Sequence, residues 1–479
     1  MVHGDTCDTT MTDGLSARVN ATLPVDPSWL ALPAGALAAG AVLQFAPVNP
    51  DAARMLAITL FCVAMWIGSP VQPWFTALIG IGLMGVGFST ELALTGFRSP
   101  ATWLVVVGLL IGEAATASGL AGLVERIALS RMPERITADA VAVYRYLLVS
   151  LSIGSFALAV LVPSSLVRVL ILAPILKSLG DLFTERSAKI GLFLGPLFAT
   201  YYGASGILTG SLANIIVTGL VESSGGPAIT WTEWTVWMGP VMGLGRVAVV
   251  VAVTYLLYRP SDRDAIDAPD TVDTVAPTTK ERRMLAFLLV GVAIWATDFV
   301  HGLHPMFGAV VVALLAFTPG IGVIDHDAIG ETDFSILFFL GAIFAIAEGL
   351  QRTDFTDLAA ETMLSYLPSD PSLPLVLLFV VGVSMLLAFV MEGMAVASVI
   401  TPVFVSFATS AGIPLVPVAM IESVALNAYF FPYQSAVLVA MLGLGVVDTM
   451  ELSRMATVCT IATMVILLPI QIALFVFFF

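Results

Sequence analysis

Long runs of apolar residues, separated by short polar connections, follow one another from residue 29 to residue 479. An α-helix needs about 20 apolar residues to cross the roughly 30 Å hydrocarbon core of a bilayer. About 11 of the runs meet this requirement. These spans are expected at 29–46, 52–70, 71–88, 101–124, 188–223, 233–258, 283–300, 305–321, 334–350, 413–446 and 453–479. The pattern predicts an all-α polytopic membrane protein embedded in a lipid bilayer.

Two further apolar tracts, 141–180 and 373–410, are each about 40 residues long, which is too long for a single span. Each has a break near its centre, VPSSL in the first tract and MEGM in the second. We expect both to form re-entrant hairpins, in which a helix–turn–helix enters the membrane and leaves on the same side. The irregular turns must then be buried in protein or line a watery cavity.

A charged segment, 259–283, divides the chain into a first half, 29–258, and a second half, 284–479. Each half has the same order of elements: a spanning helix, an amphipathic connector, a hairpin tract, and a long span interrupted by small and polar residues. The interrupted spans are 188–223 and 413–446. Internal repeats of this kind are typical of secondary transporters.

Local similarity also indicates an internal duplication. WLVVVGLLIGEAATASGL (103–120) resembles ILFFLGAIFAIAEGLQRTDF (336–355), with Gly108 and Gly341 in register.

The distribution of basic residues predicts how the halves are oriented. Arginines precede the first hairpin tract and also occur in the linker 259–283, so both regions are expected in the cytosol. The segment 351–372 has one arginine against four acids and is expected outside. The two hairpins then enter from opposite faces, and the repeats are inverted. The polar, acidic tail 1–28 lacks the features of a signal peptide. We expect a multi-pass protein of the cell membrane with a cytoplasmic N-terminus.

Composition excludes several other classes of protein. Hydrophobic residues make up 58% of the chain and charged residues 11%, whereas soluble domains carry about 25% charged residues. The net charge is −15 and no basic patch occurs, so nucleic-acid binding is not expected. The three cysteines and four histidines are scattered, without metal-ligand spacing. No cofactor is expected.

The two opposed hairpin turns are expected to meet near the middle of the membrane and to form a polar cavity. The N-termini of the helices that follow the turns present free N–H groups, which favour an anion. Carbonyl and hydroxyl oxygens of the interrupted helices can hold a cation. The chain is therefore predicted to transport a small anion.

The order of elements, the block TGFRSPATWLVVVGLLIGEAATASGL and the two hairpin-plus-interrupted-helix units resemble the divalent-anion/sodium symporter family of the ion transporter superfamily. The resemblance extends over about residues 50 to 479. It implies a homodimer, with a scaffold domain and a transport domain that slides like an elevator. It also implies Na⁺ as the coupling ion.

In that family each hairpin turn carries Ser-Asn-Thr, ten residues before a proline. In this chain the segment that begins ten residues before Pro174 is Ser164-Ser165-Leu166. The segment that begins ten residues before Pro402 is Glu392-Gly393-Met394. Only Ser164 matches. The interrupted helices of the family carry Gly-Thr-Pro-Pro-Asn-like or Thr-Pro-Pro loops. GASGILTGSLAN fits this pattern at Gly210, Ser211 and Asn214, and ALNAYFFPYQSA fits it at Pro432 and Ser435, with Asn427 and Gln434 as additional amides.

The resemblance and the chemistry of these side chains together give two sets of candidate residues. Substrate binding is expected at Ser164, Ser165, Arg168, Asn214, Glu392, Gly393, Gln434 and Ser435. Cation binding, with Na⁺ as the possible ion, is expected at Ser164, Ser205, Gly206, Thr209, Gly210, Ser211, Asn427 and Pro432. The departures from the family motifs leave both sodium coupling and dicarboxylate specificity open.

Glu392 and Arg168 are the two charged residues at the hairpin turns. A carboxylate in the membrane is costly unless it is paired, solvated or protonated. Glu392 is a candidate proton-coupling group in place of a sodium site, and Arg168 a candidate clamp for an anion, because its planar fork suits carboxylates. Alternatively the two form a structural ion pair. Other charges within apolar stretches, such as Glu422 and Arg246, are expected in structural pairs or at a membrane interface.

The sequence therefore predicts a secondary active transporter of a dicarboxylate or inorganic oxyanion, coupled to Na⁺ or H⁺. A cation/proton antiporter or arsenite-type permease of the same superfamily is one alternative, and an anion receptor or scaffold without transport is another. GASG at 203–206 also matches the GxSG of rhomboid-type proteases. That match is short and no general base accompanies it, so no enzyme is expected.

Overall fold

The computed structural model describes residues 26–261, 276–368 and 370–479, and the regular elements in these ranges are all helices. The all-α fold class is confirmed. The tail expected at 1–28 lies mostly outside the described residues, as does the centre of the linker expected at 259–283.

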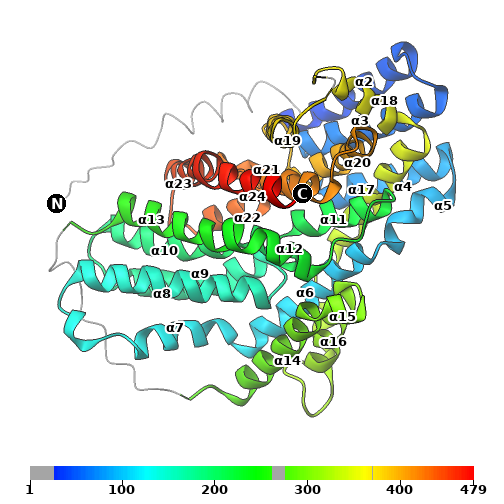
Figure 1. The fold of residues 1–479 in the computed structure, drawn as a ribbon. Helices are drawn as coiled ribbons and strands as arrows, with labels where there is room; N and C mark the ends of the chain where they lie inside the picture. Colours follow the sequence, from blue (N-terminus) through cyan, green and yellow to red (C-terminus); the bar gives the residue numbers. More distant parts are fainter. Residues whose placement is uncertain (1–25, 262–275, 369) are drawn as a thin grey trace, which may run out of the picture.

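The first half contains the following helices, several of them joined by single turns of 3-10 helix (Figure 1). They are η1 (Pro27–Leu30), α2 (Ala31–Phe45), α3 (Pro50–Gly68), α4 (Pro73–Gly87), α5 (Thr90–Leu94), η2 (Thr95–Arg98), α6 (Pro100–Ser118), α7 (Leu120–Ser130), η3 (Glu134–Ile136), α8 (Ala140–Leu161), α9 (Ser165–Gly180), α10 (Arg186–Tyr202), η4 (Gly203–Gly206), η5 (Leu208–Gly210), α11 (Leu212–Ser223), α12 (Trp231–Met238), the π-helical segment η6 (Gly239–Gly245) and α13 (Arg246–Tyr258).

The second half is built in the same way. It contains α14 (Thr279–Ala296), α15 (Asp298–His301), α16 (Pro305–Phe317), η7 (His326–Gly330), α17 (Ser335–Arg352), α18 (Phe355–Leu364), α19 (Leu373–Ala388), α20 (Gly393–Ala411), α21 (Leu415–Leu426), η8 (Pro432–Gln434), α22 (Ala436–Gly443), α23 (Thr449–Ala462), the π-helical segment η9 (Thr463–Leu467) and α24 (Leu468–Phe478).

The same order of elements occurs in both halves. A long helix (α6 or α17) leads to a shorter connector (α7 or α18), and then to a pair of helices (α8–α9 or α19–α20). An interrupted helix follows (α10–α11 or α21–α22), and after it a helix with a π-helical segment (η6 or η9). The expected duplication of elements is therefore visible in the fold. Opposite insertion of the two halves into a membrane stays a prediction.

The first hairpin tract forms α8 and α9, joined by Val162, Pro163 and Ser164. The turn falls at the VPSSL break because Pro163 has no N–H to continue a helix. Ser164 then caps α9, and its hydroxyl accepts a hydrogen bond from Val167 N–H at 3.4 Å. Both helices pack against α10, and they lie side by side in Figure 1.

The second hairpin tract forms α19 and α20, joined by residues 389–392 at the MEGM break. Both helices pack against α21. Within the described residues, 8 helical segments are long and apolar enough to cross a membrane, and α8 and α20 are among them. Helix length therefore does not distinguish a re-entrant arm from a full span, and re-entry of the two hairpins stays a prediction.

The first interrupted helix loses its regular structure between α10 and α11, where η4 and η5 take its place. Here Gly206 packs directly on the π-helical segment η6. A Cβ atom on Gly206 would lie 2.4 Å from the Cα of Gly243, a distance that carbon atoms do not tolerate. The close approach of two backbones thus depends on glycine at this position.

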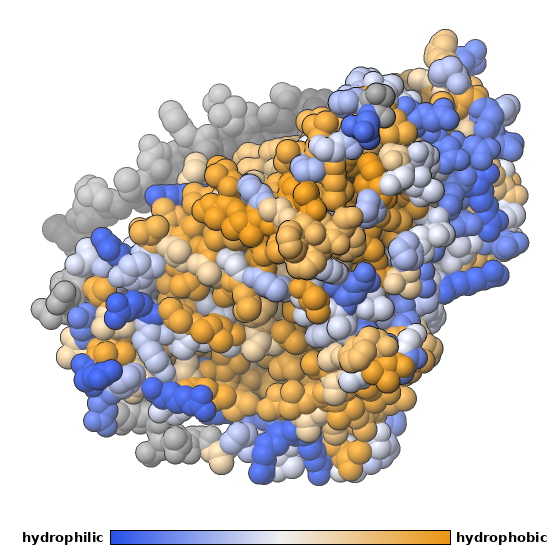
Figure 2. Space-filling view, viewed as in Figure 1, coloured by the Kyte–Doolittle hydropathy of each residue, from blue (hydrophilic) through white to orange (hydrophobic). Residues whose placement is uncertain are grey.

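The surface of the protein suits lipid. Apolar side chains cover the middle of the face shown in Figure 2, and hydrophilic residues gather mainly towards its left and right ends. Leu37, Leu244 and Leu256 are 74%, 61% and 74% exposed. Large exposed apolar areas are rare on soluble monomers. Together with the candidate spans, they indicate a multi-pass membrane protein.

Gly206→Ala is expected to destabilise the protein by about 1–3 kcal/mol, because the added methyl group overpacks the contact with η6. The measurement is thermal unfolding of the purified protein in detergent. Gly382→Ala on α19 is the matched control, because nothing lies within 4 Å of its added Cβ. If both variants unfold at the temperature of the wild type, the close contact between η4 and η6 is wrong.

Candidate functional site

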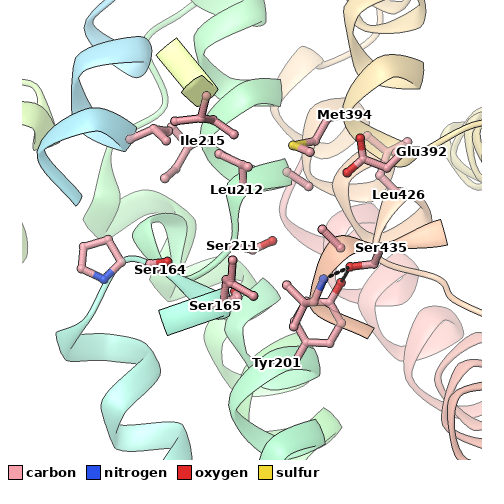
Figure 3. A pocket seen from close by; sticks show the side chains of 18 of the residues that line it. Ser164, Ser165, Tyr201, Ser211, Leu212, Ile215, Glu392, Met394, Leu426 and Ser435 are labelled. Atoms are coloured by element: carbon pink, nitrogen blue, oxygen red, sulfur yellow. Dashed lines mark hydrogen bonds between the residues drawn. The ribbon is translucent and has the colours of Figure 1, made fainter. Parts of the chain in front are cut away.

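Both hairpin turns and both interrupted helices contribute to the wall of one cavity of about 200 Å³ (Figure 3). Ser164 and Ser165 lie on one side of it, and Glu392 and Met394 lie on the opposite side. The structure thus brings together two turns that are more than 200 residues apart in sequence. Of the candidate site residues, those that line the cavity are Ser164, Ser165, Ser211, Glu392, Gly393, Gln434 and Ser435.

Four helices begin at the cavity wall. They are α9 after Ser164, α11 after Ser211, α20 after Glu392 and α22 after Ser435. The N-terminus of a helix carries roughly half a positive charge, and its first N–H groups have no acceptor within the helix. Four such ends around one small cavity favour an anion there.

The four helix ends differ in their caps. Ser164 caps α9, and Ser435 caps α22 by accepting a hydrogen bond from Val437 N–H at 3.2 Å. By contrast, α11 and α20 have no side-chain cap. The first-turn N–H groups of these two helices are therefore available to a ligand.

Aromatic side chains form the floor of the cavity. The hydroxyl of Tyr201 and the Oγ of Ser435 are hydrogen-bonded at 2.5 Å (Figure 3), and the Tyr201 ring stacks on that of Tyr429 at 5.4 Å. These contacts join α10 of the first half to the second interrupted helix. From sequence the tyrosines are equally well explained as packing residues, and only the fold places them at the cavity.

Gln434 lines the cavity, and its amide also makes three hydrogen bonds within the protein. Its Oε1 accepts hydrogen bonds from the N–H groups of Phe430 and Phe431 at 2.7 and 2.9 Å. Its Nε2 donates to the carbonyl of Ala388 at 2.9 Å. Gln434 therefore ties the second interrupted helix to the second hairpin. A contact of Gln434 with the substrate stays a prediction.

Arg168 lies behind the cavity wall and not in it, and it is completely buried. Its guanidinium donates to the carbonyl of Gly210 at 2.8 Å and to the carbonyl and Oγ1 of Thr200 at 3.2 and 3.0 Å. It also donates to the hydroxyl of Ser165 at 3.0 Å and to the carbonyl of Val162. The expected approach of Arg168 to Glu392 is therefore not found, and no ion pair joins them in the described chain.

A second buried guanidinium, that of Arg246, lies at the start of α13. It donates to the hydroxyl of Ser205 at 2.9 Å and to the carbonyl of Val424 at 3.4 Å, and it lies 5.8 Å from the centre of the Tyr202 ring. Arg246 is only 1% exposed, so of the two expected positions the buried structural one agrees with the structure. An arginine inside an apolar stretch is the one feature of the sequence that could have indicated this role. Its partners could not be predicted, because they come from both halves of the chain.

Three of the expected cation ligands already accept hydrogen bonds from donors of the protein. The carbonyl of Gly210 accepts a hydrogen bond from Arg168, and the hydroxyl of Ser205 accepts one from Arg246. The hydroxyl of Thr209 accepts a hydrogen bond from the indole of Trp231 at 3.1 Å. The expected cation ligands that do not line the cavity are Ser205, Gly206, Thr209, Gly210, Asn427 and Pro432.

Asn214 links the two interrupted helices. Its Nδ2 donates to the carbonyl of Ile207 at 2.9 Å and also, at 3.3 Å, to those of Ala204 and Ser205. Its Oδ1 accepts a hydrogen bond from the hydroxyl of Ser423 at 2.6 Å. Asn214 therefore supports the backbone of the loop and does not face the cavity, where substrate binding was expected.

Three comparisons with known proteins bear on this arrangement. The family profile described as the transmembrane region of sodium:sulfate symporters matches residues 34–477. The chain belongs to this family. The resemblance to divalent-anion/sodium symporters is thereby confirmed.

Relatives and a solved structure agree with the family. The L-tartrate/succinate antiporter of Escherichia coli strain K12 is 23% identical over 458 residues, covering 89% of this chain and 88% of that protein. The antiporter of the same name from Shigella sonnei is 22% identical over the same coverage. The YdaH transporter of Alcanivorax borkumensis is similar in fold, with a TM-score of 0.51 and 13% identity, over 89% of this chain and 97% of that one.

A member of the sodium:sulfate symporter family is a membrane transporter of anions. The relatives are transporters as well, and the general prediction of anion transport is confirmed at this level. The converging helix N-termini give that function a physical basis in this chain.

Arg168→Met is expected to lower the free energy of unfolding by about 3 kcal/mol or more, because buried carbonyl groups that accept from a charged donor lose their partner. Thermal unfolding in detergent measures the loss. Arg352→Met is the matched control, since Arg352 is 47% exposed and such substitutions change stability by about 0.5 kcal/mol or less. Equal stability of the two variants would contradict the role of Arg168 in holding the loop.

Proposed function

We propose that this protein exchanges small dicarboxylates across the cell membrane without a coupled Na⁺. The observation that carries the proposal is the position of the Arg168 guanidinium. It is bonded to the carbonyl of Gly210 and the hydroxyl of Ser165, next to the first hairpin turn. These are the kinds of oxygen that would bind a sodium ion. A positive charge that is part of the chain then takes the place of a bound cation.

Arg246 supports the same interpretation at the crossing of the two interrupted helices. Its guanidinium bonds Ser205 of the first interrupted helix and Val424 of the second. Ser205 is again a residue at which the sequence predicts a cation. Arg168 therefore lies directly behind the cavity wall, where it bonds Ser165. Arg246 lies one layer further back, against the Tyr202 ring that contacts Tyr429 of the wall.

Fixed charges favour exchange over symport for a physical reason. A bound sodium ion leaves with the substrate, but a guanidinium remains in the protein after the anion has gone. Moving an uncompensated charge through apolar surroundings is costly. The empty site therefore returns slowly, and a second anion has to bind before the protein changes conformation again.

The cavity fits a small organic anion. At about 200 Å³ it is smaller than the roughly 300–1,000 Å³ of sites for drug-sized ligands. Tyr201 and Ser435 are hydrogen-bonded to each other, which leaves one of their two hydroxyl protons for a carboxylate, and the uncapped helix ends offer further N–H groups. Leu212 and Met394 offer apolar contact to a short carbon chain. The relatives carry the names of tartrate and succinate, two four-carbon dicarboxylates.

The proposal includes three features that follow from the family resemblance. They are a homodimer, an elevator-like transport domain that contains both hairpins and both interrupted helices, and a cytoplasmic N-terminus. Native mass spectrometry of the protein in detergent tests the dimer. Accessibility of a cysteine introduced in the tail, from each side of a sealed vesicle, tests the orientation.

Proteoliposomes loaded with succinate are expected to take up labelled succinate or tartrate in Na⁺-free buffer, whereas empty vesicles take up little. The reason is that the empty site retains its uncompensated charge. The initial rate of uptake is the measurement, with an inward Na⁺ gradient as a separate arm.

An Na⁺ gradient is expected to add nothing to the exchange rate. Uptake into empty vesicles that requires an Na⁺ gradient would contradict the proposal and indicate symport. Vesicles without protein provide the background.

A further inference from the structure

Glu392 holds an unusual place in the site. Among the described residues it is the one charged side chain that lines the central cavity. It also lines a second, larger cavity of about 560 Å³, again as the one charged side chain there. The two cavities share Ile336, Glu392, Met394 and Ala436. Glu392 therefore stands where one cavity adjoins the other.

The carboxylate of Glu392 has no hydrogen bond and no ion pair within the described chain, although its residue is the N-cap of α20. Every other polar side chain that lines the central cavity is neutral. A carboxylate in this position lies in the field of the helix ends that would otherwise attract the substrate. It therefore competes with the negative charge of any anion that binds.

We propose that Glu392 limits the cargo to one net negative charge, so that a dicarboxylate is carried together with one proton. The inference rests on the proposed exchange of carboxylates at this same cavity. It adds which protonation state the site accepts, and it makes Glu392 a specificity-determining residue.

The formal charges near the site carry the argument. Arg168 and Arg246 contribute two positive charges behind the wall, and Glu392 contributes one negative charge in it. A cargo with one negative charge brings the three groups and the ligand to zero. A dianion would leave one negative charge in excess, and an excess charge is expensive to move through the membrane. One added proton removes that excess.

The proton belongs to Glu392 and the substrate jointly. When two carboxyl groups share a site, like charges disfavour double ionisation, and one proton serves both. The apparent constants then describe the pair and not either group alone. A dicarboxylate that enters as its hydrogen form and one that enters as a dianion beside protonated Glu392 give the same loaded state.

Other titratable groups near Glu392 are engaged elsewhere. The hydroxyl of Tyr433 donates to the carbonyl of Phe389 at 2.9 Å. The hydroxyl of Tyr429 donates to Asn427 Oδ1 at 3.3 Å, and Tyr201 is paired with Ser435. The α3, α4 and α17 residues at the second cavity are uncharged.

Glu422 is the other buried acid on an element that packs against α20. Its Oε1 accepts a hydrogen bond from the hydroxyl of Thr401 at 2.6 Å. It lines neither the central nor the second cavity. Glu422 is completely buried and has no positively charged partner among the described residues, so it is counted as a neutral acid and lies outside the proposed pair. It provides a matched comparison in which an acid is removed at a buried position.

The test is isothermal titration of purified full-length protein with succinate, in two buffers of different ionisation enthalpy. The wild type is expected to take up about one proton for each succinate bound at neutral pH. Its affinity for succinate is expected to fall about tenfold for each unit of rising pH. Monomethyl succinate, a monoanion of similar length, is expected to bind with no proton uptake.

Glu392→Gln is expected to bind succinate with no proton uptake and with an affinity that no longer depends on pH. Glu392→Asp keeps a carboxylate at the turn and is expected to keep the proton uptake. Glu422→Gln is expected to behave as the wild type. Thermal unfolding of each variant shows that it is folded.

Three results would each overturn the inference. The first is succinate binding to the wild type without proton uptake, the second is proton uptake that persists in Glu392→Gln, and the third is proton uptake that disappears in Glu422→Gln. If no carboxylate binds to the wild type at any pH, the proposed function itself fails. That outcome differs from binding without a proton, which refutes only the role of Glu392.

Discussion

The structure depends on one constraint: interrupted helices in an apolar protein need partners for the backbone groups that their breaks expose. Water cannot supply these partners throughout a bilayer core, so the protein supplies them itself. Asn214 holds three carbonyl groups of the first loop. Arg168 holds the carbonyl groups of Val162, Thr200 and Gly210. The first hairpin turn and the first interrupted helix are thus supported from behind, and the uncapped start of α11 stays free to face the cavity.

The choice of arginine for this task has consequences for function. A neutral amide satisfies carbonyl groups equally well, as Asn214 does, but a guanidinium also adds a permanent charge. Arg168 bonds Ser165 at the start of α9, one of the helix ends that favour anions, and Arg246 adds a second charge behind the Tyr202 ring. The same contacts that stabilise the loops therefore set the electrostatic field of the site. Structural support and selectivity for anions are not separate features in this protein.

Glu392 is the counterpart of this positive field. It occupies the second hairpin turn, across the cavity from Ser164 of the first. The duplicated architecture makes the two turns equivalent in position, but their chemistry differs. One turn is backed by an arginine, and the other presents a carboxylate. An asymmetric pair of turns in a repeated fold gives a single cavity both an attraction for anions and a limit on their charge.

The class of the fold, the two helix–turn–helix tracts, the two interrupted helices and the place of each break can all be predicted from the sequence. These features follow from local patterns: the length of apolar runs, a proline or glycine within them, and the repeated order of elements. The sequence also identified Ser164, Ser211, Glu392 and Ser435 as residues near the site. Such residues stand at helix starts, which the pattern of the chain specifies directly.

The directions of the longer side chains depend on the packing of the folded protein and could not be predicted from the sequence. Arg168 was expected to face the opposing hairpin, but its guanidinium turns back to the carbonyls of its own half. Arg246 and Gln434 form hydrogen bonds with residues far away in sequence. Gly108 and Gly341 are equivalent positions of the two repeats, but Gly108 packs against Pro163 and Gly341 packs against Phe97. The position of a residue along a helix fixes where its side chain begins. Its partners depend on which segments pack beside it, and those contacts are decided by the whole fold.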